Sequence, residues 1–148
     1  MLKGIIKTDN DFASLILRLS LGVVMFPHGA QKAVGWYGGN GIEATLNFFT
    51  DDLGIPLYLA ILVVAAEFLG AIGLIVGCLT RIAALGIGVT MVVAAAMFHA
   101  QHGFFMNWFG NQQGEGFEYH IIAAAIAFVL VIKGGGFGSL DKMMSKEN

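Results

Sequence analysis

Four long apolar segments, separated by more polar stretches, set the pattern of this chain. They cover residues 12–34, 57–79, 82–101 and 117–132. A helix that crosses a bilayer needs about 20 mostly apolar residues, so we expect each segment to be a membrane span. The last segment is the weakest, because 16 residues make a helix of only about 24 Å. A chain of three spans with a half-buried last segment is the alternative.

The apolar segments predict helices and not the strands of a membrane barrel. Residues 82–96 show no alternation of polar and apolar positions, which the wall of a barrel requires. Backbone groups inside a bilayer must be hydrogen bonded within the protein, and a continuous apolar run of this length achieves that as a helix. We therefore expect an all-α fold, a four-helix integral membrane bundle, with residues 1–148 as a single domain.

Lysine and arginine positions predict how this bundle is oriented. The basic residues outside the spans lie before the first, between the second and third, and after the fourth: Lys3, Lys7, Arg81, Lys133, Lys142 and Lys146. The loops 35–56 and 102–116 contain no lysine or arginine. Because cytoplasmic loops are enriched in these residues, we expect both termini and the Arg81 turn in the cytoplasm. This alternation requires an even number of spans.

Composition supports a membrane protein and excludes several other classes. Hydrophobic residues make up 57% of the 148 residues and charged residues only 12%, against roughly a quarter charged in soluble domains. Disorder needs the opposite balance. A net charge of -2 and the absence of a basic stripe argue against nucleic acid as a partner. One cysteine excludes an intramolecular disulfide. The expected partner is a lipid bilayer.

Small residues and one proline predict how the spans pack. The second span carries small residues along one helical face: Ala66, Gly70, Gly73 and Gly77. Such a face lets helix backbones approach closely. Pro27 interrupts the hydrogen bonds of the first span just before His28. The three glycines at 134–136 predict a flexible exit from the fourth span.

The most informative residues are ionisable groups inside the spans, which are costly in hydrocarbon and usually face the bundle interior. These are Arg18 in the first span, Glu67 in the second and His99 in the third. The estimated depths of Arg18 and Glu67 differ by about one helical turn, so we expect these two side chains to interact, directly or through water. Such a pair would either fix the register of two helices or serve as an anchor or proton relay beneath a ligand.

All four histidines are expected in the outer half of the bundle: His28, His99, His102 and His120. Imidazoles can exchange protons with a quinone or ligate a transition metal. No spacing singles out a metal, because the chain has neither a two-cysteine motif nor a His-Glu-x-x-His helix, and we assign no metal ligand. A metal at the histidines stays an open alternative. Trp36 and the other outer tryptophans and tyrosines form either an interfacial belt or a platform for a flat ligand.

The order of these residues resembles the DoxX family of small bacterial membrane proteins. The resemblance covers residues 12–135 and is carried by Arg18-Leu-Ser-Leu-Gly22, Phe26-Pro-His-Gly-Ala-Gln-Lys32, Glu67-Phe-Leu-Gly70, Thr80-Arg81 and Met97-Phe-His99. It implies a four-helix inner-membrane protein of a family usually labelled oxidoreductase, with some relatives linked to thiosulfate:quinone oxidoreduction or to quinone, oxidative or thiol stress. Carried over by position, the functional residues are Arg18, Lys32, Glu67, Arg81 and His99.

These observations favour a subunit of a quinone-linked oxidoreductase. A quinone headgroup would lie between His28, His99 and His120, with Lys32 and Trp36 beside it. Glu67 would move protons and Arg18 would hold the charge of Glu67. The chain has no flavin or dinucleotide fingerprint, so a redox partner protein or soluble donor must supply electrons.

Two functions from other classes stay open. A proton-coupled transporter of small molecules could use Glu67 as its exchanging carboxylate, and would need a homo-oligomer because four helices are too few to enclose a path. A membrane scaffold for a soluble redox enzyme needs no site chemistry.

Overall fold

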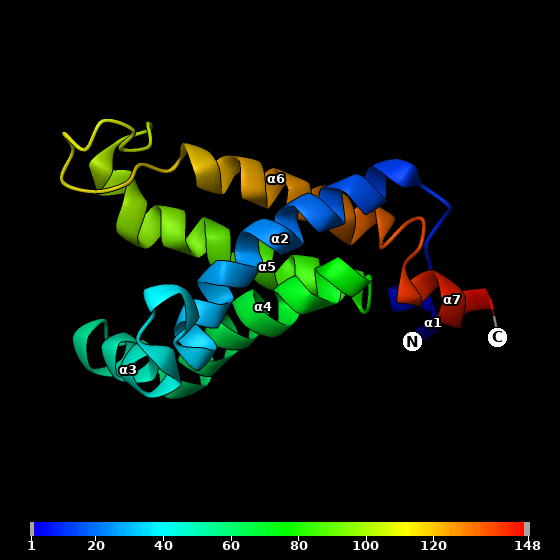
Figure 1. Cartoon of the computed structure of the whole chain (residues 1–148), viewed down its shortest axis with the longest axis horizontal. Coiled ribbons are helices and arrows are strands. Elements are labelled where there is room, and N and C mark those ends of the chain that lie inside the picture. Colours follow the sequence, from blue (N-terminus) through cyan, green and yellow to red (C-terminus); the bar gives the residue numbers. More distant parts are fainter. Residues whose placement is uncertain (1, 147–148) are drawn as a thin grey trace.

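The computed structural model describes residues 2–146, and all secondary structure in that range is helical (Figure 1). Its elements are, in chain order, α1 (Leu2–Ile6), α2 (Phe12–Val34), η1 (Trp36–Gly38), α3 (Gly41–Asn47), η2 (Phe48–Asp52), α4 (Leu57–Val76), α5 (Thr80–Ala94), η3 (Ala95–His99), η4 (Ala100–His102), α6 (Glu118–Lys133) and α7 (Leu140–Lys146). The predicted all-α fold is confirmed.

In the described part of the chain, three stretches are long and apolar enough to cross a membrane: α2, α4, and α5 continued through η3 and η4 to His102. The fourth predicted span forms α6, whose 16 residues make about 24 Å of helix. That is less than the roughly 30 Å of a typical hydrocarbon core.

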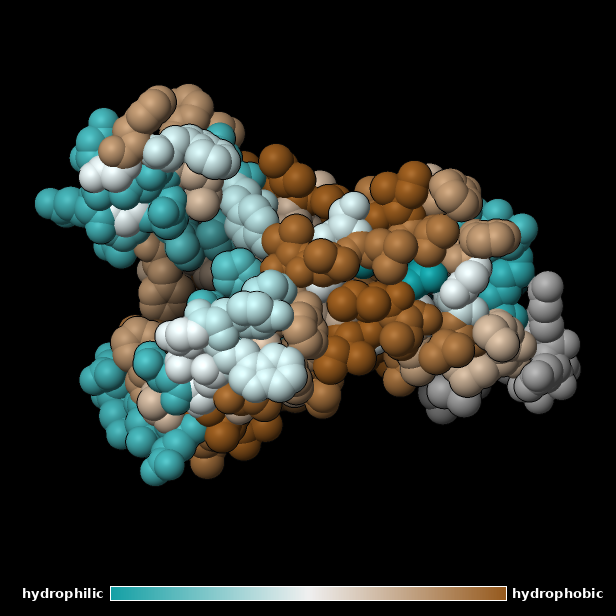
Figure 2. Space-filling model, in the orientation of Figure 1, coloured by the Kyte–Doolittle hydropathy of each residue, from teal (hydrophilic) through white to brown (hydrophobic). Residues whose placement is uncertain are grey.

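The helices form two pairs that part at one end of the molecule. α2 packs along α4, and α5 packs along α6, while α4 and α5 are joined by a tight turn. The chain termini lie at the same end as this turn (Figure 1). At the opposite end the pairs diverge into two lobes, and the space-filling view is hollowed between them (Figure 2). One lobe holds α3, and the other holds the 103–117 loop (Figure 1).

The outer surface is apolar over the middle of the bundle, as a lipid-facing surface must be. Leu62, Leu69, Val92 and Phe128 are all at least 59% exposed. Figure 2 shows hydrophobic residues across the middle of the visible face and hydrophilic residues at the lobes. A soluble protein rarely exposes apolar surface on this scale.

Glycine and alanine allow the close packing of the helix pairs. A Cβ built at Gly29 of α2 would lie 2.5 Å from Phe68 Cα and 2.6 Å from the Glu67 carbonyl carbon of α4. The predicted small-residue face of the second span is confirmed against α5, where a Cβ at Gly86 would lie 3.0 Å from Ala66 Cβ. The tightest approach between long helices, however, is at Gly29.

Arg18 connects α2 to α4 and to the 134–139 segment at the end of the bundle that carries the chain termini. Its Nε donates to Gly135 O at 2.9 Å and its Nη1 to Leu74 O at 3.0 Å. Further bonds reach the carbonyls of Ile75, Phe137 and Gly138. The guanidinium therefore binds carbonyls in the last turn of α4, where helix hydrogen bonds run out, and in the 134–139 segment.

The 134–139 segment and α7 are fixed to the bundle, so the expectation of a flexible exit at 134–136 is wrong. All three glycines are buried, and Gly136 N donates to Thr8 Oγ1 at 2.8 Å. The carboxylate of Asp141 accepts from Leu79 N at 2.7 Å and Thr80 N at 2.8 Å, which caps α5. Glycine is needed here for close packing: a Cβ at Gly135 would lie 2.6 Å from Ser139 Cβ.

We predict that Gly29→Ala destabilises the protein by roughly 1–3 kcal/mol, because the added methyl group must push α2 from α4. Thermal unfolding in detergent micelles measures this. Gly70→Ala is the matched control, because a Cβ at Gly70 would meet its neighbours at an ordinary 3.5 Å. Equal effects of the two substitutions would contradict the proposed role of Gly29.

A second prediction concerns Asp11, the N-cap of α2. Hydrogen bonds from Lys133, Ser14 and the Ala13 backbone lower the pKa of its carboxyl. A carboxyl with a lowered folded-state pKa stabilises the protein above its unfolded pKa, about 3.9, and this contribution is lost as pH falls through the folded value. The fall in melting temperature between pH 6 and pH 3 should therefore be smaller in Asp11→Asn than in the parent. Asp9→Asn, whose side chain makes none of these contacts, should behave like the parent.

Candidate functional site

The end of the bundle with the two lobes contains an ion pair between α2 and α4. Lys32 Nζ donates to Glu67 Oε2 at 2.5 Å, and the two side chains are 29% and 5% exposed respectively. The contact at Gly29 places α2 level with Glu67. Lys32 lies one helical turn beyond Gly29, so its long side chain reaches back to the carboxylate.

Arg18 does not contact Glu67, and the predicted pair is wrong. The hydrogen bonds of Arg18 to α4 go to the carbonyls of Leu74 and Ile75, about 10 Å further along α4 at 1.5 Å per residue. A long cationic side chain extends toward the nearer end of the membrane, and for Arg18 that end carries the chain termini. Lys32 takes the place beside Glu67 that was assigned to Arg18.

Two histidines face each other at the base of the lobe that holds the 103–117 loop. The ring centroids of His99, at the end of η3, and His120, in the first turn of α6, are 4.1 Å apart. His99 Nδ1 lies 2.9 Å from the Glu115 carbonyl oxygen, which only accepts, so this nitrogen carries a proton and donates. The neutral His99 ring then has Nε2 as an acceptor. His120 is 7% exposed, and its buried Nδ1 has no hydrogen-bond partner among residues 2–146.

His28 connects the ion pair with the histidine pair. Its ring, exposed on α2, lies within electrostatic reach of Lys32 and Glu67, and His120 lies within reach of both His28 and His99. Of the predicted site residues, the structure therefore brings together Lys32, Glu67, His28, His99 and His120 where the two helix pairs part.

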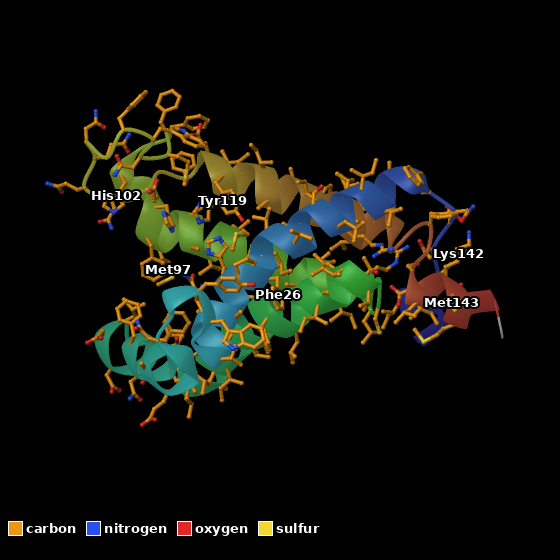
Figure 3. The ribbon with its side chains drawn as sticks, in the orientation of Figure 1. Phe26, Met97, His102, Tyr119, Lys142 and Met143 are labelled. Atoms are coloured by element: carbon orange, nitrogen blue, oxygen red, sulfur yellow. The ribbon has the colours of Figure 1, made fainter. Side chains whose placement is uncertain are left out.

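Tyr119, one of the outer tyrosines predicted to form a belt or a platform for a flat ligand, also belongs to this region. Its hydroxyl lies 3.4 Å from Met25 Sδ of α2, and its ring packs edge-on against His120 at 5.5 Å. It lies within electrostatic reach of Glu67. Figure 3 shows Tyr119, Phe26 and Met97 around the point where the lobes part. A tyrosine at the start of a helix gave no sequence signal that separated it from the belt.

Trp36 and His102 lie outside this cluster. Trp36 packs edge-on against Phe26 of α2 at 6.4 Å, and Phe26 in turn stacks on Phe68 of α4 at 5.9 Å, so Phe26 links Trp36 to α4. His102 packs where Gly114 leaves room for it and lies in the lobe that holds the 103–117 loop (Figure 3). Within residues 2–146, no three His, Cys, Asp or Glu side chains form a group suited to a metal ion.

These features define a small helical membrane protein with ionisable side chains gathered near one end of its bundle. The chain belongs to the DoxX family, whose sequence profile matches residues 13–100. That region spans α2 to the first residue of η4 and contains His28, Lys32, Glu67 and His99.

Two relatives match nearly the whole chain. The putative oxidoreductase CatD of Bacillus subtilis (strain 168) is 27% identical over 136 residues, which cover 92% of this chain and 90% of CatD. The inner membrane protein YqjF of Escherichia coli (strain K12) is 23% identical over 141 residues, which cover 95% of this chain and 98% of YqjF. No solved structure matches the chain.

We predict that Lys32 and Glu67 are energetically coupled. Lys32→Met leaves a carboxylate that is 5% exposed without its cation, and should cost roughly 1–3 kcal/mol. That is less than the 3–5 kcal/mol of a fully buried pair, because Lys32 still reaches the surface. The double variant Lys32→Met/Glu67→Leu should recover part of this loss. Unfolding measurements on the two single variants and the double variant test it, and simple additivity would show that the pair is not coupled.

Proposed function

We propose that this protein is a quinone-linked oxidoreductase subunit of a bacterial inner membrane, with α6 as a fourth span and both termini in the cytoplasm. One observation carries the proposal: within residues 2–146, His120 has a buried, unpartnered Nδ1 and packs at a tilt against His99, within reach of His28, which in turn lies within reach of the Lys32–Glu67 pair. The relative named an oxidoreductase and the relative named an inner membrane protein support the class and the location.

The proposed orientation rests on the positions of positive charge. The elements at the end that carries the termini hold the basic residues: Lys7 follows α1, Arg81 lies in the first turn of α5, Lys133 ends α6 and Lys142 lies in α7 (Figure 1). Cytoplasmic ends carry such residues. α6 is paired along α5, so it would cross the bilayer beside it. Its short length would be met by local thinning of the bilayer.

The residues at the site fit a quinone. A quinone carbonyl accepts hydrogen bonds, and a quinone becomes a quinol by taking up two electrons and two protons. Buried polar atoms are almost always hydrogen bonded, so an unpartnered His120 Nδ1 is suited to a ligand that the protein alone does not contain. In the tautomer with a proton on Nδ1, His120 would donate to such a carbonyl.

The remaining residues of the cluster would supply and return protons. His99, held through Nδ1 by the Glu115 carbonyl, would keep the His120 ring in place. His28, exposed and within reach of Glu67, would pass protons between the protein surface and the buried pair. The two electrons would come from a redox partner protein or a soluble donor.

The proposal predicts quinone binding that depends on this cluster. Purified protein titrated with a short-chain quinone analogue should bind it, and His99→Ala and Glu67→Gln should weaken binding about tenfold, the effect of losing one hydrogen bond or charge contact of about 1.4 kcal/mol. His120→Phe keeps a ring against His99 and should weaken binding as much. His102→Ala is the histidine control and should bind like the parent. Unchanged affinity in all three cluster variants would show that the quinone, if bound, lies elsewhere.

A further inference from the structure

A groove opens on the side of the molecule between α5 and α6. Its volume is about 430 Å³, within the roughly 300–1,000 Å³ of ligand pockets. The α5 side, continued through η3 and η4, contributes Met91, Ala95, Ala96 and Ala100, and the α6 side contributes His120 and Ala124. Every residue that lines the groove is apolar except His120.

Local helix geometry explains the space. Residues 95–99 form a π-helical turn, which widens the helix and is frequent at functional sites. Alanine occupies three lining positions on this side, so the side chains leave room that larger residues would fill. The groove therefore lies at the level of the outer turns of α5, within the candidate span Thr80–His102.

Position and polarity together identify the kind of molecule that the groove suits. At this depth the surrounding medium is hydrocarbon, so a ligand would enter sideways from the bilayer. The groove wall offers one polar ring, His120, which is more than nine-tenths buried, and that ring also belongs to the proposed headgroup site. A ligand that fits both would have a polar ring at one end and a hydrocarbon tail at the other.

We infer that the groove holds the hydrocarbon tail of a lipid-soluble quinone whose ring binds at His120, and that the protein selects tailed quinones over tailless ones. This inference rests on the proposed function and adds the substrate class. A phospholipid would share the tail but would bring a charged headgroup to a wall that has no charged residue.

Three ligands and two matched variants test the inference. The ligands are a tailless dimethoxybenzoquinone, the same ring with a decyl tail, and decanol, which has the tail without the ring. Ala96→Phe fills the groove, and Ala125→Phe adds the same side chain at an exposed position of α6 that does not line it. Native mass spectrometry from micelles counts each bound ligand. Ligand concentrations are expressed as the molar ratio of ligand to detergent.

The parent and Ala125→Phe should bind the decyl quinone about tenfold more tightly than the tailless ring. Ala96→Phe should lose this preference and leave tailless binding unchanged. Equal binding of the two quinones by the parent, or a preference that survives Ala96→Phe, would overturn the inference while leaving the proposed function intact. If the parent binds neither quinone but binds decanol in a manner that Ala96→Phe abolishes, the proposed function fails and the groove remains a tail site. Failure to bind any of the three overturns both.

Discussion

The contact of α2 with α4 at Gly29 is the constraint on which the rest of the site depends. A residue with a side chain at this position would meet the backbone of Glu67 and Phe68, so the two helices can come this close only through glycine. That contact sets which side chains are level across the interface. It brings Lys32 within 2.5 Å of Glu67 and leaves Arg18 to the other end. A carboxylate this deep is tolerated in a membrane only with a partner, and the helix contact decides which partner it has.

Charged groups at the two ends of the bundle do different work. At the end with the termini, Arg18 and Arg81 donate to carbonyls at the ends of α4 and α6, and Asp141 accepts from the start of α5. Cations at helix C-termini and anions at helix N-termini both interact favourably with the helix dipole. Most of their hydrogen bonds go to backbone groups, although Arg81 Nε is buried without a partner among residues 2–146. In the cluster at the other end, His120 keeps a nitrogen with no partner in the protein and the His28 ring remains exposed.

The length and continuity of the apolar runs were sufficient to predict the helices, because a bilayer allows few alternatives for such runs. The gathering of Glu67, His99 and His120 was predictable for the same reason: groups that lipid cannot solvate turn inward. His28 joins them from an exposed position on α2. Which cationic side chain pairs with Glu67 was not predictable. Depth was counted from helix ends, but α4 continues past the end of α2 to pack with α3, so Glu67 is level with Gly29 and not with Arg18. The buried glycines at 134–136 look like a linker in sequence, because glycine serves both flexible chain and tight packing.

The distribution of bonds also explains why the ligand site can be open. Nearly all side-chain links between distant segments described above, from Arg18, Arg81, Asp141 and Thr8, lie at the end with the termini. The lobes at the other end part from one another (Figure 1), and across their base α2 meets α6 through contacts such as Tyr119 with Met25. Ligand-binding regions are commonly the less stable parts of a fold. Hydrogen bonds fix the bundle at the end with the termini and hold the charged groups there in register. The lobes at the opposite end can then admit a molecule between them. The groove between α5 and α6 at His120 offers that molecule a path from the lipid.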